Sequence, residues 1–159
     1  MGKISVLFVC LGNICRSPTA HATFQQLIER EGLSHRVVVD SAGTGDWHIG
    51  HPPDPRSTQA ARRRAISLES LTARLVIEED FYRFNYLLAM DQKNLQALKE
   101  MAPANFKGQL GLFLDFAERG DYREVPDPYY AGHEGFELVL DLVEDASQGL
   151  LTHLRARCL

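Results

Sequence analysis

The chain has little cysteine: Cys10, Cys15 and Cys158 are the only three among 159 residues. An odd number of cysteines without regular spacing is not a disulfide framework. A chain of this length buries roughly 68–70% of its unfolded surface on folding, so it needs neither disulfides nor a metal for stability. Because no signal-peptide pattern precedes the first apolar run either, we expect one domain over residues 1–159 in a reducing, cytoplasmic compartment.

Long apolar runs and an excess of positive charge are also missing. No run approaches the ~20 apolar residues that a membrane-spanning helix needs. The 17 Lys and Arg residues are outnumbered by 21 Asp and Glu residues, whereas nucleic-acid-binding proteins usually carry a basic face. The one basic cluster, residues 62–64, is typical of a solvated helix face, with a patch for an acidic partner as the alternative. We therefore expect no membrane or nucleic-acid partner, and a monomer or weak dimer.

Strand and helix signals alternate along the chain, which is the pattern of a parallel α/β sheet. Residues 4–9 (ISVLFV) are nearly all apolar, as in a strand that is buried on both faces. The pattern predicts further strands at 36–41, 86–89 and 109–114, and helices at about 18–31, 55–65, 78–82, 92–101 and 132–157. The expected fold is a three-layer αβα sandwich with a four-stranded parallel sheet, of the flavodoxin-like type.

The segment CLGNICRSP, from Cys10 to Pro18, follows the first expected strand and opens the first expected helix. Open α/β sheets bind ligands at the carboxyl ends of their strands, and a helix N-terminus at that edge attracts anions through its free N–H groups. The same helix end, with a nearby cation, favours the thiolate form of a cysteine, which is the nucleophilic form. The segment therefore predicts an anion site with a nucleophile in it.

The spacing within this segment suits a phosphate group. Five residues separate Cys10 from Arg16, enough for a cup whose N–H groups point at phosphate oxygens, with Gly12 permitting the backbone turn. The guanidinium of Arg16 adds a planar fork for two of these oxygens. A buried structural thiol is the alternative role of Cys10, and the constellation disfavours it. The expected phosphate-binding residues are Leu11, Gly12, Asn13, Ile14, Cys15, Arg16 and Ser17.

This segment resembles the phosphate loop of the low-molecular-weight protein tyrosine phosphatases. Blocks at 40–44 (DSAGT), 53–56 (PDPR), 79–81 (EDF), 90–95 and 125–130 (VPDPYY) resemble that family in order and spacing. The resemblance covers about residues 4–145. It implies a protein tyrosine phosphatase that hydrolyses phosphotyrosine and aryl phosphates through a cysteinyl-phosphate intermediate. It also implies phosphotyrosine proteins or peptides as partners, with no cofactor and no metal, because Arg16 and the amides supply the positive charge.

The resemblance assigns roles to particular side chains. It places Asp127, between two prolines, over the cup as the general acid; without the resemblance, a simple turn is the better interpretation of this Asp-Pro pair. Ser17 is expected to hydrogen-bond the Cys10 sulfur, with capping of the first helix as its alternative role. Asn13 is expected to brace the cup in a left-handed backbone conformation, which Asn tolerates. Ser41 resembles the family's supporting hydroxyl.

Three aromatic residues, Trp47, Tyr129 and Tyr130, are expected to wall a deep cleft that holds a phosphotyrosine ring and that phosphoserine is too short to enter. Their alternative role is surface or core packing. For Cys15 the resemblance implies a reversible disulfide with Cys10, while a small buried side chain is the other interpretation. Cys158 is expected to be inert.

The sequence departs from the family pattern at two positions. Leu71 stands where some members carry a histidine that braces the Asn-Ser network, and His21 stands where a glutamate is common. His48 and His51, three apart in a loop, are a weak metal pattern because no carboxylate or cysteine joins them.

Several rival functions stay open at this point. Arsenate reductase relatives need extra cysteines in mid-chain, and this chain has none between Cys15 and Cys158. Phosphoarginine phosphatase relatives carry threonine where this chain has Ile14. A non-catalytic phosphotyrosine-binding module would tolerate loss of Cys10 or Asp127, and both are present. A metal-binding or redox scaffold is the remote alternative.

Overall fold

The structure is a computed structural model that describes residues 2–129 and 131–159. Its centre is a sheet in the order β2-β1-β3-β4, with every neighbouring pair parallel. The four-stranded parallel sheet and the α/β class expected from the sequence are confirmed. The strands are β1 (Ile4–Cys10), β2 (Val37–Gly43), β3 (Tyr86–Ala89) and β4 (Gln109–Leu112).

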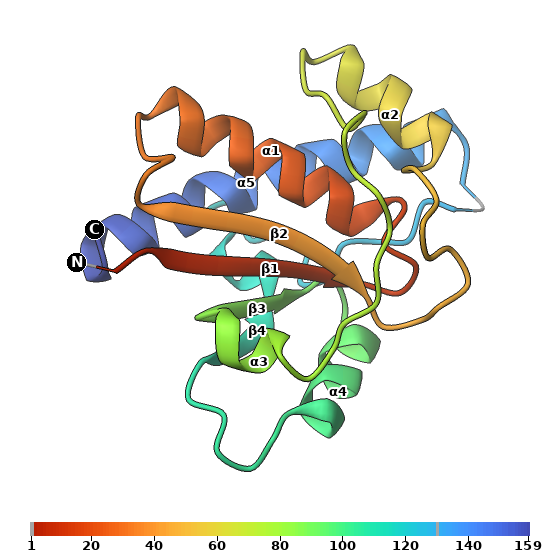
Figure 1. Cartoon of the computed structure of the whole chain (residues 1–159). Helices are drawn as coiled ribbons and strands as arrows, with labels where there is room; N and C mark the ends of the chain where they lie inside the picture. Colours follow the sequence, from red (N-terminus) through yellow and green to blue (C-terminus); the bar gives the residue numbers. More distant parts are fainter. Residues whose placement is uncertain (1, 130) are drawn as a thin grey trace.

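The helices cover both faces of this sheet (Figure 1). On one face lie α1 (Arg16–Arg30) and α5 (His133–Arg157), and on the other lie α3 (Asp80–Arg83) and α4 (Gln92–Met101). The short α2 (Pro55–Arg62) packs against α5 beside the N-terminal end of α1. Among the helices of the described chain, none is long and apolar enough to cross a membrane.

The continuous apolar run of β1 follows from its central position. Side chains of a strand alternate between the two faces of a sheet. Val6, Phe8 and Cys10 pack into the core under α1 and α5, whereas Leu7 and Val9 pack into the core on the side of α3 and α4. Both sets are nearly inaccessible, so from Val6 onward both faces of β1 are buried. This arrangement delivers Cys10 to the carboxyl edge of the sheet with its side chain on the α1 side.

Some boundaries differ from the expected ones, for identifiable reasons. Helix α1 begins at Arg16, so Pro18 lies in its first turn as expected, where the missing N–H of a proline costs no hydrogen bond. Helix α2 ends at Arg62, and the chain then turns through Ala65, which has φ 62°. Strand β4 stops at Leu112 because residues 113–116 form the 3₁₀ helix η1 (Phe113–Phe116).

The basic cluster at 62–64 joins two elements instead of forming a free face. Arg63 and Arg64 both reach Glu137 on α5, at 3.1 and 2.8 Å. Arg64 also pairs with Asp141 at 3.0 Å and Glu144 at 3.2 Å. Partly exposed pairs of this kind contribute little individually, about 0–1 kcal/mol each. Their effect is to orient the end of α2 on α5, which leaves little free positive charge for an acidic partner.

Gly149 marks the closest approach of α5 to η1. A Cβ added at this position would lie 1.6 Å from the carbonyl oxygen of Phe116. We expect Gly149→Ala to lower the free energy of unfolding by about 2–3 kcal/mol, because the backbone of η1 must move. The control is Gly111→Ala, where an added Cβ meets nothing within 4 Å. Urea unfolding measures both; equal stability of the two variants would contradict this packing.

Candidate active site

The loop between β1 and α1 closes around the Cys10 sulfur. Its main-chain turn depends on Asn13, which has φ 57°, the left-handed conformation expected of it. The main-chain N–H of Asn13 donates to the sulfur at 3.2 Å. Both polar atoms of the Asn13 side-chain amide make hydrogen bonds that hold the turn. The Oδ1 atom accepts from the main-chain N–H of Arg74 at 3.0 Å, and Nδ2 donates to Ser17 Oγ at 2.8 Å.

The structure explains the glycine at position 12 by close packing, and not by the backbone turn that we expected. The positive φ of the loop falls on Asn13, and Gly12 does not share it. A Cβ on Gly12 would lie 2.9 Å from Cδ2 of His48. The small residue therefore lets the His48 ring approach the loop, a contact that the sequence did not predict.

Ser17 lies where the sequence predicts it. Its hydroxyl is 3.0 Å from the Cys10 sulfur and 3.4 Å from the carbonyl oxygen of Ala42. Because Asn13 Nδ2 already donates to Ser17, the Ser17 hydroxyl is free to donate, and the sulfur is its nearer acceptor. A helix-capping role is not observed, because Ser17 is the second residue of α1, whose N-cap is Cys15 without a side-chain cap.

The Arg16 side chain is buried, and its guanidinium is held by hydrogen bonds to Asp91 and to the main chain of Val125. Its Nη1 donates to Asp91 Oδ2 at 2.7 Å and to the carbonyl oxygen of Val125 at 3.0 Å, and its Nη2 lies 3.8 Å from Asp127 Oδ2. Burial opposes the guanidinium charge, but the Cys10 sulfur, Asp91 and Asp127 outweigh it and raise the pKa of Arg16 above its ordinary value. Arg16 is therefore a permanent cation beside the sulfur.

Asp91 is a site residue that sequence reasoning left without a role. It lies two residues after the end of β3 and caps α4 through Oδ1, which accepts from the main-chain N–H of Asn94 at 2.8 Å. The other carboxylate oxygen is then free to hold Arg16. The available signal was its position, since a polar residue after a buried parallel strand lies at the same edge as the end of β1.

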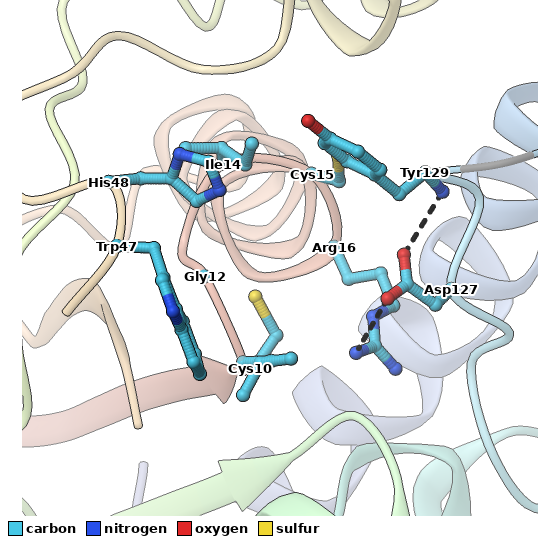
Figure 2. A pocket seen from close by; sticks show the side chains of 10 residues that line it. Cys10, Gly12, Ile14, Cys15, Arg16, Trp47, His48, Asp127 and Tyr129 are labelled. Carbon is cyan, nitrogen blue, oxygen red and sulfur yellow. Dashed lines mark hydrogen bonds and ion pairs between the residues drawn. The ribbon is translucent and has the colours of Figure 1, made fainter. Parts of the chain in front are cut away.

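A cavity of about 310 Å³ opens above the sulfur. Figure 2 shows the Cys10 sulfur directed into the space between Trp47 on one side and Asp127 and Tyr129 on the other. Trp47 is 66% exposed and Tyr129 37%, so both belong to the rim of the cavity and not to the core. Tyr130, the third expected wall residue, lies outside the described residues. The full lining is Cys10, Leu11, Gly12, Ile14, Cys15, Arg16, Trp47, His48, Asp127 and Tyr129.

Asp127 stands at the rim of this cavity, where its side chain is 49% exposed. One carboxylate oxygen accepts from the main-chain N–H of Tyr129 at 3.0 Å, and the other faces Arg16 (Figure 2). Asp127 therefore makes the hydrogen bond of a short turn and also lies at the rim of the cavity above the Cys10 sulfur. Proline on both sides limits the backbone freedom of this carboxylate.

His48 also lies at the rim of the cavity, a position that the sequence did not predict. Its ring lies 6.4 Å from the ring of Tyr129 and 6.0 Å from that of His51. The local sequence distinguishes His48 from His51 only in that His48 lies next to Trp47. Over residues 2–129 and 131–159, no group of three or more His, Cys, Asp or Glu residues has the geometry to hold a metal ion.

Cys15 is a buried residue of the loop that also contributes to the lining of the cavity. It packs with Ala60, Leu140 and neighbouring apolar residues, and both it and Cys10 are free thiols. Burial, reinforced by the charge of Asp54, raises the pKa of Cys15 to about 12. Its disulfide with Cys10 stays a prediction.

The two departures from the family pattern lie behind the loop. Leu71 packs against the same apolar cluster as Cys15, and the polar contact to Asn13 comes instead from the main chain of Arg74. His21, half-buried on α1, has its Nδ1 3.0 Å from the hydroxyl of Ser41 on β2.

The chain is similar to known phosphatases in both sequence and fold. The family model described as "Low molecular weight phosphotyrosine protein phosphatase" matches residues 5–158. The low molecular weight protein-tyrosine-phosphatase YfkJ of Bacillus subtilis is 44% identical over 152 residues, covering 96% of each chain. A crystal structure of a protein tyrosine phosphatase from Entamoeba histolytica superimposes with a TM-score of 0.94 at 38% identity, over 99% of this chain and 100% of that one. A Drosophila arginine phosphatase structure matches with a TM-score of 0.90 at 31% identity, over 96% and 98% of the two chains.

The two loop cysteines are expected to react differently with iodoacetamide. At pH 7–8 a thiol with a pKa of about 12 is protonated and a poor nucleophile, so Cys15 should stay unlabelled while Cys10 is alkylated. Peptide mapping by mass spectrometry measures the labels. In urea all three cysteines should react, which is the control for detection. Labelling of Cys15 in the folded protein as fast as the half-buried Cys158 would contradict its burial.

Proposed function

The chain belongs to the low molecular weight phosphotyrosine protein phosphatase family and is a protein-tyrosine phosphatase, and we propose that Cys10, Arg16 and Asp127 carry its catalysis. One observation supports this assignment above all. The Cys10 sulfur lies under an open cavity, at hydrogen-bond distance from the Ser17 hydroxyl and the Asn13 amide, with a buried arginine beside it. Each of these groups favours a negative charge on the sulfur or in front of it.

The phosphate is bound by main-chain amides and one guanidinium. Loop residues Leu11, Gly12, Ile14, Cys15 and Arg16 line the cavity at the N-terminus of α1, where free N–H groups and the helix dipole attract anions. Arg16 needs a partner for its buried charge, and Asp91 supplies one from below, so that Nη2 can turn toward phosphate oxygens. The positive charge that the reaction requires thus comes from the chain itself.

The first half-reaction transfers the phosphoryl group to sulfur. The thiolate of Cys10 attacks phosphorus, a P–S bond forms, and the bond from phosphorus to the tyrosine oxygen breaks. Asp127 donates a proton to the leaving phenolate oxygen. The same amides and Arg16 neutralise the equatorial oxygens as charge develops on them.

The second half-reaction releases inorganic phosphate. Asp127, now a carboxylate, takes a proton from the water that attacks phosphorus, and the P–S bond breaks. The thiolate that leaves is stabilised by the hydrogen bond from Ser17 and by Arg16. A water can reach this point because Asp127 is half-exposed at the rim of the cavity.

The rim selects an aromatic phosphate ester. Trp47 and Tyr129 offer ring faces on opposite sides of the cavity, between which a phosphotyrosine ring can lie. Because the nucleophile must stay a free thiol, we place the reaction in a reducing, cytoplasmic compartment. We further propose that the acting unit is a single domain over residues 1–159, as a monomer or weak dimer.

Substrate choice tests the proposed function. The wild-type protein should release phosphate from a phosphotyrosine peptide and leave the matched phosphoserine and phosphoarginine peptides nearly untouched, because only the aryl ring fills the rim. Malachite-green detection of phosphate measures all three. Cys10→Ser is the control: it should abolish turnover while still binding the phosphotyrosine peptide. Comparable turnover of phosphoarginine, or activity that survives Cys10→Ser, would overturn the assignment.

Removal of the general acid should depend on the leaving group. For Asp127→Ala we expect a loss in kcat of about 10²-fold or more with weakly acidic phenols and a much smaller loss with strongly acidic ones, which leave without protonation. A series of aryl phosphates measures the trend. Asp121→Ala, an exposed carboxylate nearby in the chain, is the matched control and should behave as wild type. Equal slowing across the series would reject the acid role of Asp127.

A further inference from the structure

A continuous series of contacts runs behind the phosphate loop and ends at the Cys10 sulfur. It begins at His21, one turn beyond Ser17 on α1, whose Nδ1 lies 3.0 Å from Ser41 Oγ on β2. The main-chain N–H of Ser41 donates to Oδ1 of Asp40 at 2.8 Å. The other oxygen of Asp40 accepts from Arg74, from Nε at 3.2 Å and from Nη2 at 3.1 Å.

Arg74 connects this series to the loop. Its guanidinium is fixed a second time by Asp80, which is fully buried and accepts from Nη1 and Nη2 at 3.0 Å each. Burial opposes the charge of Arg74, but Asp80 and Asp40 outweigh it and raise the pKa of the guanidinium. With its side chain held from two directions, Arg74 presents its main-chain N–H to Asn13 Oδ1 at 3.0 Å.

The last steps have a defined direction. Because Arg74 donates to Asn13 Oδ1, the other end of that amide is its NH₂ group, which donates to Ser17 Oγ. The Ser17 hydroxyl hydrogen is then left for the Cys10 sulfur. A rotation of the Asn13 side chain would therefore remove the hydrogen bond that faces the nucleophile.

Helix α1 closes this series of contacts into a ring, because it carries both Ser17 and His21. Ser17 and His21 are four residues apart on the same helix, so they lie one above the other. The His21–Ser41 contact is the point where this closed ring ties α1 to the carboxyl half of β2. Without it, the hydroxyl of Ser41, a buried residue, would lose the polar partner that α1 provides.

We infer that His21 is a positioning residue of this phosphatase: through Ser41, Asp40 and Arg74 it holds Asn13, and thereby directs the Ser17 hydroxyl at the Cys10 sulfur. The inference rests on the proposed role of Cys10 as nucleophile. His21 touches neither the cavity nor the sulfur, so it acts only through the groups between them. The charged residues that act on its ring are Asp40 and Arg74.

The protonation state of His21 is consistent with this role. Burial lowers the pKa of His21; the negative charge of Asp40 opposes this effect and the positive charge of Arg74 adds to it. The ring is accordingly neutral at pH 7, and a neutral imidazole can either accept from or donate to the Ser41 hydroxyl. His21 also lines a surface hollow with Leu71, Gln25 and Ser70, which leaves room for substitutions.

The test compares His21→Leu with His21→Asn. Leucine fills the space without a polar atom, whereas asparagine places one near the position of Nδ1. We expect His21→Leu to lower kcat about 10-fold with KM nearly unchanged, as misplacement of a reacting group does. It should also move the pH midpoint of Cys10 alkylation upward. His21→Asn should restore both, and His35→Leu, the same change at an exposed histidine before β2, should alter neither.

A second substitution separates this pathway from general packing. If His21 acts through Ser41, the loss in kcat of the double variant His21→Leu/Ser41→Ala should be no greater than the larger single loss. Additive losses, an unchanged alkylation profile in His21→Leu, or a loss that His21→Asn does not restore would overturn the inference. Activity that survives Cys10→Ser would instead overturn the proposed function, so the two failures are distinguishable.

Discussion

The left-handed turn at Asn13 is the constraint on which the rest of the site depends. A non-glycine residue at φ 57° costs about 1–3 kcal/mol and persists only where its surroundings fix it. Here the Asn13 side chain makes a hydrogen bond at each end, so the strained turn is held by groups from two other segments. The turn aims the Asn13 N–H at the Cys10 sulfur, which makes the loop a cup before any anion enters. Pre-formed donors of this kind need little reorganisation during the reaction.

The buried positive charge of Arg16 is compensated by two carboxylates, Asp91 and Asp127, that lie at different distances from it. Arg16 is almost inaccessible to water, and a buried guanidinium without a partner would be strongly unfavourable. Asp91 relieves this cost from the side away from the cavity, while Asp127 approaches from the rim at 3.8 Å. The closer carboxylate thus holds the guanidinium, and the more distant and exposed one is the residue that we propose as the general acid. The two carboxylates beside this arginine differ in burial and in hydrogen bonds.

The sheet order explains why these groups meet. In the order β2-β1-β3-β4, the central β1 has β2 on one side and β3 on the other, so the loops that follow them diverge and leave a crevice at the carboxyl edge. Cys10 ends β1, Asp91 follows β3, and the loop after β2 carries Trp47 and His48. The further support from Asp40, Ser41 and Arg74 comes from β2 and the segment that runs beside it. One edge of the sheet therefore supplies the proposed nucleophile, the carboxylate that holds Arg16 and two residues that line the cavity.

The sequence by itself determined whatever depends on neighbours along the chain. The apolar run of β1, the strand-to-helix position of the loop, the spacing from Cys10 to Arg16 and the left-handed Asn13 are local features, and all were predictable; the strand positions were correct to within a few residues. Tyr130 lies outside the described residues, and the roles of Cys10, Arg16 and Asp127 came partly from resemblance. Only the tertiary structure decided that Asp91 holds Arg16, that His48 lies against Gly12, and that Arg74 and His21 support Asn13 and Ser41. These contacts join residues 20 to 75 positions apart, so they exist only because a packed sheet brings its strand ends together, and no local pattern of residues encodes them.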